Sequence, residues 1–156
     1  MKFEQYLIRP LEKTELSKPV DYFLGIKDDE LIGMGVDKSK LLSREDWHQL
    51  LLSDFDQRLE DKKFYYLGWY DGHELIGHSN INSTEYGEHA TIHLHMWNSQ
   101  NRQSGLGTFL FRESINFFLE IFKLKKIICE PAASNPAPHR VFKKLGIPVL
   151  KEYEVV

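Results

Sequence analysis

An alternating strand that runs directly into a long apolar helix is the feature that most constrains how this 156-residue chain can fold. The strand is predicted over residues 90–97, where apolar and polar side chains alternate. One face carries Ile92, Leu94 and Met96, and the other carries Thr91, His93, His95 and Trp97. The helix is predicted from about Gln103 to Phe122. Its apolar positions are Leu106, Phe109, Leu110, Ile115, Phe118 and Phe122, which are expected to pack back against the sheet.

The junction between the two elements, residues 98–108, has the features of an anion-binding site. Gly105 and Gly107 let the backbone turn tightly and remove the Cβ atoms that would keep an anion away. The first N–H groups of the helix have no partner within it, and the helix dipole adds partial positive charge there. Arg102 adds a permanent cation that suits phosphate oxygens. The sequence therefore predicts a pyrophosphate site, although the same glycines also suit a simple turn. Its residues are Arg102, Gln103, Ser104, Gly105, Leu106, Gly107 and Thr108.

A second informative segment spans residues 127–147. It has the pattern of a short buried strand, a loop, a helix and a glycine stop. The strand is expected to lie parallel to the 90–97 strand, since the long helix joins them by a right-handed crossover. Asn135 precedes the second helix, where its side chain is expected to cap that helix, to contact a ligand, or both.

Both segments resemble the GCN5-related N-acetyltransferase (GNAT) superfamily in its two most recognisable motifs. The first, Arg/Gln-x-x-Gly-x-Gly/Ala, is met by Arg102, Gly105 and Gly107. The second, an Asn followed by a helix that ends in Lys-x-Gly-aromatic, is met by Asn135, Lys144 and Gly146, with Ile147 where an aromatic residue is usual. The spacing of Asn135, Arg140 and Val141 looks most like the branch that contains the ribosomal-protein alanine acetyltransferases. The motifs cover residues 90–147, and the order of elements matches more coarsely to the N-terminus.

The resemblance implies a single N-acetyltransferase domain over residues 1–156. Its expected α/β fold, of the α+β type, has a mixed, mostly antiparallel sheet with helices on both faces, and acyl-CoA lies in the splay between the fourth and fifth strands. The implied activity is acetyl-CoA-dependent N-acetyl transfer to a primary amine by direct attack. Backbone groups of Met96, Trp97 and Asn98 are expected to align the thioester. The other predicted coenzyme contacts are Asn135, His139 and Phe142.

Acetyl transfer to an amine needs a base, because a lysine-like ammonium is neutral in only about one molecule in 2,500 at pH 7, which costs roughly 4.6 kcal/mol. His93 and His95 are candidates, and their strand resembles in register the one that carries relay histidines in arylalkylamine acetyltransferases. The two histidines also fit a merely polar strand face. Glu130, and Glu85 or Glu88 in the turn, are alternative bases that would work through water. A metal site is not favoured, because the strand offers no cysteine or carboxylate at ligand spacing.

The general acid departs from the family pattern. Many members carry a tyrosine seven residues after the Asn, where this chain has Phe142, and an alanine or serine three residues after it, where this chain has Pro138. Thiolate release is then expected to rely on water, on His139 or on Tyr153, since a thiol of pKa about 8.5 leaves readily. Phe142 also keeps open a non-catalytic acyl-CoA-binding module. An interaction domain with an accidental glycine turn is a third interpretation.

Composition narrows the classes of partner. The formal net charge of −3 gives no general attraction to nucleic acid or to anionic membranes. The one cysteine, Cys129, cannot form an internal disulfide, and the first residues lack the apolar run of a signal peptide, so a cytoplasmic monomer or homodimer is expected. The expected acceptor is a small-molecule amine or a protein N-terminus. Acidic residues near the predicted pocket mouth slightly favour a cation; they are Asp28, Asp29, Glu30 and Asp37.

Local sequence patterns predict the secondary structure of the N-terminal half. Residues 3–9 read as a strand, and residues 14–26 as a weak helix interrupted by Pro19. Residues 28–40 are expected to form a solvated loop, although the corresponding region lines the acceptor pocket in the family. Ser43 opens a capping box with Asp46. The helix that follows is expected to pack into the core through Trp47, Leu50, Leu51, Phe55 and Leu59.

The middle of the chain predicts a hairpin. Strands over residues 64–70 and 73–82 flank Asp71-Gly72, which suits a type I′ turn, and residues 85–89 lead into the next strand. Near the C-terminus, residues 148–156 leave room for one strand, where the family usually ends in a hairpin of two. Either a truncated end or a partner subunit that completes the sheet edge is expected.

Overall fold

The computed structural model describes residues 2–98 and 105–151, and the strands there form a single mixed sheet in the order β1-β2-β3-β4-β5. The strands are β1 (Tyr6–Pro10), β2 (Tyr65–Asp71), β3 (Glu74–Glu85), β4 (His89–Met96) and β5 (Lys126–Ile128). The α-helices are α1 (Ser17–Leu24), α2 (Asp28–Gly33), α3 (Arg44–Phe55), α4 (Leu106–Ile121) and α5 (Pro136–Leu145). Neighbours from β1 to β4 are antiparallel, and β5 is parallel to β4. The predicted mixed, mostly antiparallel sheet is confirmed.

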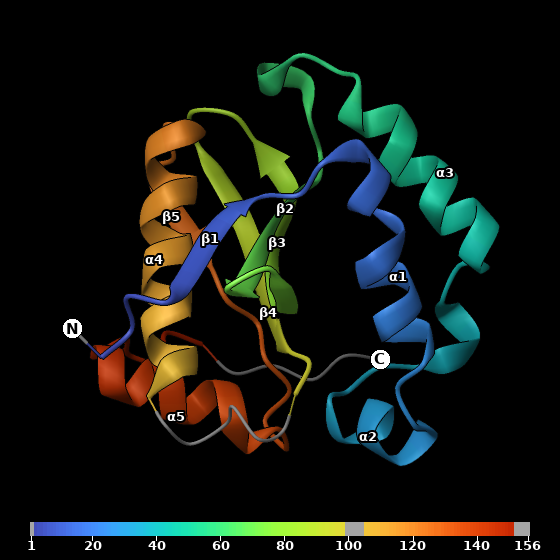
Figure 1. Cartoon of the computed structure of the whole chain (residues 1–156). Helices are drawn as coiled ribbons and strands as arrows, with labels where there is room; N and C mark the ends of the chain where they lie inside the picture. Colours follow the sequence, from blue (N-terminus) through green and yellow to red (C-terminus); the bar gives the residue numbers. More distant parts are fainter. Residues whose placement is uncertain (1, 99–104, 152–156) are drawn as a thin grey trace.

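Helices cover both faces of the sheet (Figure 1), and the alternation of side chains along β2 explains how. Leu67 and Trp69 are fully buried on the face covered by α4. Tyr66 and Tyr70 are buried on the opposite face, beneath α1 and α3. Because successive side chains of a strand point to opposite faces, an interior strand with core on both sides is apolar throughout. The predicted helices on both faces are confirmed.

A buried polar network fastens α4 to the sheet. The Ser114 hydroxyl accepts hydrogen bonds from Trp69 Nε1 (3.1 Å) and Ser79 Oγ (2.8 Å), and it donates to the Leu110 carbonyl (2.8 Å). Trp69, Ser79 and Ser114 have no exposed surface, so their polar atoms depend on one another rather than on water. A hydroxyl has one donor and two acceptor sites, and all three are used here. The network therefore fixes how α4 is turned toward β2 and β3.

β4 and β5 separate soon after they pair. Residues 89–91 of β4 face residues 126–128 of β5, and β4 then continues to Met96. Within the described residues, β5 offers β4 no partner from Ile92 onward. One edge of β4 therefore faces an opening between the two strands, where the splay is predicted.

The β2–β3 hairpin confirms the predicted strands and corrects the turn. Asp71 pairs with Glu74, so the two central residues are Gly72 and His73. Gly72 has φ +59°, whereas His73 is not among the described residues with positive φ. Positive φ at the first central position alone is the pattern of a type II′ turn. The predicted type I′ turn, centred on Asp71 and Gly72, is therefore wrong.

The segment before α3 is more helical than predicted. Residues 28–40, expected as a solvated loop, contain α2 and a short 3₁₀ helix at Lys38–Lys40. Leu31 is 1% exposed and anchors α2, but one buried side chain in so short a helix gives no periodic signal. The predicted interruption of the first helical region is present at Leu16 rather than at Pro19. Pro19 lies in the first turn of α1, where its missing N–H has no helical partner to lose.

α3 begins as predicted, but its apolar stripe is only partly in the core. The Ser43 hydroxyl accepts a hydrogen bond from the backbone N–H three residues later, at 3.1 Å. Leu51 is 3% exposed, whereas Leu50 is 40% and Phe55 36% exposed. Leu59 lies beyond α3, in a 3₁₀ helix. The predicted burial is wrong for Leu50 and Phe55, because α3 packs on α1 along a narrow side.

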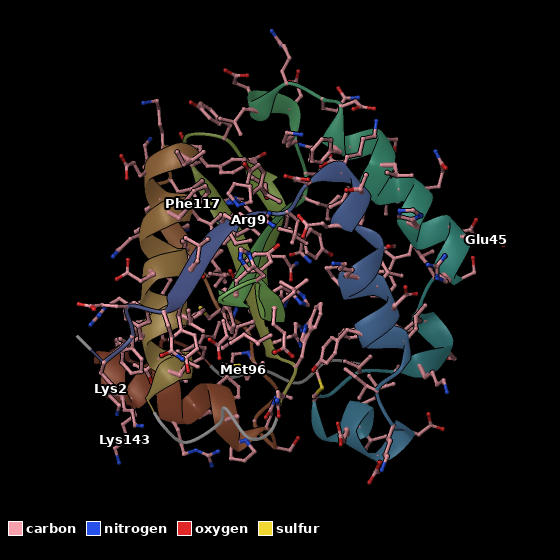
Figure 2. The ribbon with its side chains drawn as sticks, viewed as in Figure 1. Lys2, Arg9, Glu45, Met96, Phe117 and Lys143 are labelled. Atoms are coloured by element: carbon pink, nitrogen blue, oxygen red, sulfur yellow. The ribbon has the colours of Figure 1, made fainter. Side chains whose placement is uncertain are left out.

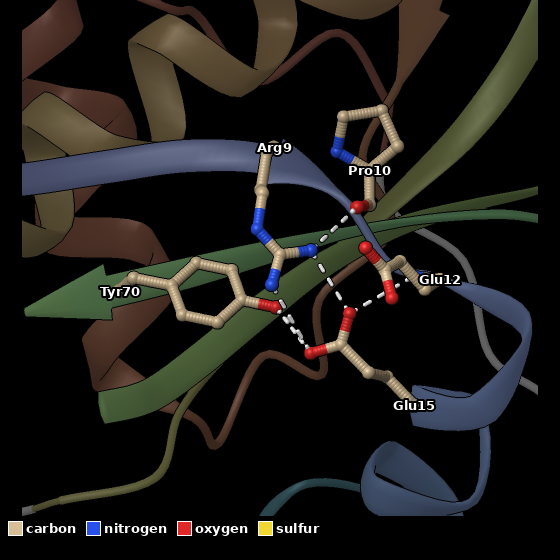
Figure 3. Close-up of polar contacts among 5 residues, drawn as sticks. All are labelled: Arg9, Pro10, Glu12, Glu15 and Tyr70. Atoms are coloured by element: carbon tan, nitrogen blue, oxygen red, sulfur yellow. Dashed lines mark hydrogen bonds and ion pairs between the residues drawn. The ribbon is translucent and has the colours of Figure 1, made fainter. Parts of the chain in front are cut away.

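A cluster of polar contacts ties β1 and the following turn to β2 (Figure 3). Arg9 donates to both carboxylate oxygens of Glu15, at 2.9 and 3.3 Å, and the Tyr70 hydroxyl donates to the same carboxylate at 2.8 Å. The Arg9 guanidinium also lies 4.2 Å from the centre of the Tyr70 ring. The hydrogen bond from Arg9 is the main reason that the pKa of Glu15 falls from 4.5 to about 2. The entry to α1 is thereby held against the sheet.

The ends of the described chain differ from the predictions. β1 begins at Tyr6 rather than at residue 3, since residues 2–5 form turns. Residues 148–151 contain no strand, and Tyr153 lies outside the described residues. In the part of the chain that the structure describes, none of the helices has the length and apolar character needed to cross a membrane.

Candidate active site

A cavity of about 810 Å³ lies where β4 and β5 separate. One side of it is built by the N-terminus of α4, the loop after β5, and α5. The other side is built by α1, by α2 with the segment that follows it, and by α3. Residues of β2, β3 and β4 lie between the two sides. Met96, at the end of β4, lies between these sides (Figure 2). The cavity therefore joins the predicted anion site to the predicted acceptor region.

The N-terminus of α4 keeps its backbone open toward this cavity. Gly105 is the N-cap, with φ +83°, a left-handed conformation that suits glycine. The N–H of Phe109 makes the first helical bond, to the Gly105 carbonyl at 3.1 Å, so the N–H groups of Gly107 and Thr108 precede the helical ladder. A Cβ added at Gly107 would have no described neighbour within 4 Å.

The structure brings part of the predicted anion site to the cavity. Gly105, Gly107 and Thr108 line it. Leu106 is 1% exposed, so its side chain belongs to the core. α4 begins at Leu106 rather than at Gln103, since the left-handed Gly105 ends the helical conformation. Arg102, Gln103 and Ser104 lie outside the described residues.

Of the three backbone positions predicted to align a thioester, Met96 is the one whose N–H points toward the opening between β4 and β5. The N–H of Trp97 donates to the Ile76 carbonyl at 2.9 Å, so it points toward β3. Successive N–H groups of a strand point to opposite sides, so that of Met96 points toward the opening between β4 and β5. Asn98 follows the end of β4 and is exposed.

His93 has the geometry of a general base. Its Nε2 lies 3.2 Å from Asn82 Oδ1, an atom that only accepts, so the Nε2 carries the proton and Nδ1 has a lone pair to offer. Burial lowers the pKa of His93, and the negative charge of Glu130 opposes that effect. His93, Asn82 and Glu130 all line the cavity. The two predicted residues, His93 and Glu130, are thus brought together.

His95 lies in the same cavity but is a weaker base. Burial, followed by the charge of His93, lowers the pKa of His95 to about 3. Its ring stacks on that of His78 at 5.0 Å between centres and meets the edge of Phe23 at 5.4 Å. A neutral, stacked imidazole suits a wall better than a proton acceptor, so His93 is the stronger of the two candidates.

His78, Trp97 and Tyr22 form an aromatic group, of which the sequence analysis singled out Trp97 and missed His78 and Tyr22. Trp97 Nε1 donates to His78 Nδ1 at 2.9 Å, and the Trp97 ring stacks on Tyr22 at 5.1 Å. Burial holds the pKa of His78 well below 6.5, so this imidazole is neutral. The pairing of β3 with β4 could have indicated His78, because His78 lies directly opposite His95 in that pair of strands.

Some of the predicted residues at α5 line the cavity, and others support the scaffold around it. Asn135 occupies the N-cap position of α5, one of its two predicted roles, but its side chain makes no capping hydrogen bond. Asn135 and Phe142 line the cavity, and Phe142 also packs 5.7 Å from Phe111. The His139 ring nitrogen lies 3.1 Å from the Ala132 carbonyl, where it steadies the loop after β5. His139 is not among the residues that line the cavity.

Other candidate bases and nucleophiles lie elsewhere or are inert. Glu85 and Glu88 sit at the opposite end of β4, where Glu88 pairs with Lys125 at 3.0 Å, and neither lines the cavity. Cys129 lines it just after β5, but burial raises the pKa of its thiol to about 11, so the thiol is a poor nucleophile. Among the described residues, no group of three or more histidine, cysteine or acidic side chains is arranged to hold a metal ion.

Of the acidic residues predicted near the pocket mouth, only Glu30 lines the cavity. Asp28 pairs with Lys38 at 2.8 Å, and Asp37 accepts from the backbone and hydroxyl of Ser39. These partners belong to the α2 region itself. The expected preference for a cation therefore depends on one carboxylate of this group.

Comparison with known proteins places the chain in a family. The model described as "Acetyltransferase (GNAT) family" matches residues 36–147, whereas no curated protein matches the sequence. Spermidine N-acetyltransferase from Vibrio cholerae in complex with CoA and spermine is a similar solved structure (TM-score 0.71, 17% identity, 91% of this chain and 80% of that chain). Ribosomal-protein-S5-alanine acetyltransferase from Vibrio fischeri is another, with a TM-score of 0.72 at 18% identity, covering 94% of this chain and 81% of that chain.

A predicted acetyltransferase with acetyl-CoA from Clostridium acetobutylicum has a TM-score of 0.68 at 15% identity and covers 97% of this chain and 95% of that chain. At such identities these structures show a shared fold. The family model adds sequence evidence, because it spans more than half of the chain and includes both motifs noted above. The chain belongs to the acetyltransferase (GNAT) family.

Proposed function

We propose that this protein is an acetyl-CoA-dependent N-acetyltransferase in which a primary amine attacks the thioester directly. The observation that carries the proposal is one continuous cavity, lined by the N-terminus of α4, by the end of β4, and by His93 and Glu130. A coenzyme whose pyrophosphate lies at α4 can extend its thioester along the open edge of β4. An amine can then approach from the α1–α2 side.

The coenzyme side of the cavity offers groups that suit a pyrophosphate and a thioester. The N–H groups of Gly107 and Thr108 face the phosphates in this proposal, with Arg102 contributing as the sequence predicts. Arg140 and Lys144 of α5 line the same side and add positive charge. The end of β4 at Met96 lines the cavity, and we assign the thioester to this segment.

The proposed reaction needs one proton acceptor. The amine nitrogen attacks the thioester carbon while His93 Nδ1 takes the proton that the amine loses. Glu130 stabilises the imidazolium, because its negative charge opposes the desolvation of His93. The tetrahedral oxyanion then collapses, the C–S bond breaks, and the CoA thiolate leaves. The amide product forms, and the thiolate takes a proton from the imidazolium or from water.

Phe142 favours a second candidate function, an acyl-CoA-binding module without catalysis. It occupies the position where many family members carry a proton-donating tyrosine, and it packs against Phe111 instead. Both functions require coenzyme binding, so binding alone does not separate them. Turnover does, because only the transferase releases free thiol when an amine is present.

The test combines calorimetric titration of CoA with a thiol-release assay on a panel of amines. Gly107→Val adds a branched side chain to the open start of α4 and should weaken CoA binding by at least about tenfold, or ~1.4 kcal/mol. Glu45→Val, at the matching position of α3, is exposed and should leave binding unchanged. Turnover with an amine supports the transferase. Binding without turnover on the whole panel supports the module, and no CoA binding by the wild type overturns both.

A further inference from the structure

The acceptor side of the cavity has an aromatic wall. Tyr22 and Phe23 of α1, Trp47 of α3 and Tyr66 of β2 line it. The rings brace one another, since Phe23 meets Trp47 edge-on at 5.4 Å and Tyr66 lies 5.6 Å from His78. Apolar side chains from α2 and the segment after it complete the lining; they are Met34, Val36 and Leu41. The wall is therefore preformed and suited to a flat apolar group.

From this wall we infer that the acceptor is a monoamine that carries an aromatic group, with the ring against the wall that α1 and α3 present to the cavity and the amine near His93. This inference rests on the proposed transferase function and names its substrate class. Offset or edge-to-face contacts with Phe23 and Trp47 would hold the ring. The amine would then point toward β4, where the thioester lies in the proposed complex.

The charges around the cavity favour one positive centre on the acceptor. Among the described lining residues, the carboxylates are those of Glu30 and Glu130. Arg140 and Lys144 bring two positive charges to the α5 side of the same cavity. A polyamine would place additional cations against the apolar walls, which costs free energy when they are unpaired. A monoamine needs one carboxylate, and Glu130 lies near His93, where its negative charge opposes the larger effect by which burial lowers the pKa of His93.

The imidazoles in the wall support the same conclusion. Burial lowers the pKa values of His78 and His95, so both rings are neutral at pH 7 and do not repel an ammonium group. Trp97 donates to His78 Nδ1, which places the His78 proton on Nε2. The wall thus combines aromatic faces with neutral polar edges, a surface that suits an aromatic ring better than a polycation.

The test compares kcat/KM for 2-phenylethylamine, tryptamine, spermidine and an alanine-terminated peptide in the thiol-release assay. We expect the two aromatic amines to exceed the other acceptors by at least about tenfold. Trp47→Leu should raise KM for the aromatic amines about five- to tenfold while leaving KM for acetyl-CoA unchanged. Phe55→Leu is the matched control, because Phe55 is an aromatic residue of the same helix that does not line the cavity.

The outcomes separate this inference from the proposed function. Turnover that is fastest with spermidine or with the peptide keeps the transferase and overturns the aromatic acceptor. Equal effects of Trp47→Leu and Phe55→Leu also overturn it, because the wall would then have no special role. If no amine is acetylated, the transferase fails, and calorimetric titration of tryptamine into the CoA-bound protein decides the inference separately. Binding that Trp47→Leu weakens supports the aromatic site, and absence of binding overturns it.

Discussion

Ser114→Ala is the change that most directly tests how α4 is held on the sheet. The wild-type hydroxyl satisfies the indole N–H of Trp69 and the hydroxyl of Ser79 in a region without exposed surface. Removing it leaves the indole N–H without its acceptor, which costs about 1–3 kcal/mol, and leaves a small void as well. We therefore expect the free energy of unfolding to fall by about 2–3 kcal/mol.

Urea denaturation followed by tryptophan fluorescence measures this loss, and the melting temperature should fall by about 4–12 °C. Ser53→Ala is the matched control, since Ser53 is also a helical serine that donates to a backbone carbonyl, at 3.0 Å, but at an exposed position. The control should stay within about 0.5 kcal/mol of the wild type.

A double-mutant cycle isolates the hydrogen bond itself. Trp69→Phe removes the indole donor, so Ser114→Ala should cost at least about 1 kcal/mol less in that background than in the wild type. If Ser114→Ala costs no more than Ser53→Ala, or if the two core changes add without coupling, the buried network does not hold α4 and the reasoning is wrong.

Three further predictions concern titration. His93→Gln should remove the acidic limb of the kcat/KM profile, which in the wild type should lie below pH 6.5 because burial lowers the pKa of His93; an unchanged limb would exclude His93 as the base. Glu130→Gln should keep that limb but move it to lower pH, since the carboxylate raises the pKa of His93, and a shift to higher pH would contradict the assignment. Glu15→Gln should lower the free energy of unfolding at pH 7 by about 1–2 kcal/mol, measured by denaturant titration. A fall of the pKa from 4.5 to about 2 corresponds to ~3 kcal/mol, but water screens the ion pair because the partner Arg9 side chain is 37% exposed. The Glu15 pKa is depressed on folding, so this contribution is present above pH 4.5 and is lost as the pH falls toward 2; the Glu15→Gln and wild-type curves should converge there, and parallel curves would refute the linkage.

The parts of the fold that the sequence predicted well depend on local patterns. The alternation over β4 and the apolar period of α4 each follow from neighbouring residues, and so does the glycine that starts the helix. The Gly105 conformation was predictable because a tight turn into a helix requires a backbone that most residues avoid. The hairpin strands were equally clear. The type of its turn was not, because pairing of Asp71 with Glu74 moves the centre by one residue without changing the residues present.

The failures occurred where burial depends on a distant partner. Leu50 and Leu51 are both leucines of α3, yet one is 40% and the other 3% exposed, because only the packing of α3 on α1 decides which side faces inward. α2 was missed for a related reason. Its single deeply buried side chain, Leu31, leaves no period to detect in a short charged segment.

The two sides of the candidate site differ in the same way. The side of the cavity that α4 and α5 build is encoded in continuous segments, so the sequence motifs predicted Gly105, Gly107 and Asn135 there. The acceptor side is assembled by packing: Tyr22 reaches Trp97 only because α1 lies across the sheet, anchored by neighbours such as Val20 against the face that carries Tyr66 and Tyr70. No motif within α1 marks such a role. Specificity for the acceptor is therefore expected to vary with changes in α1 and α3 that leave the anion site intact, and this separation is what the comparison of Trp47→Leu with Gly107→Val measures.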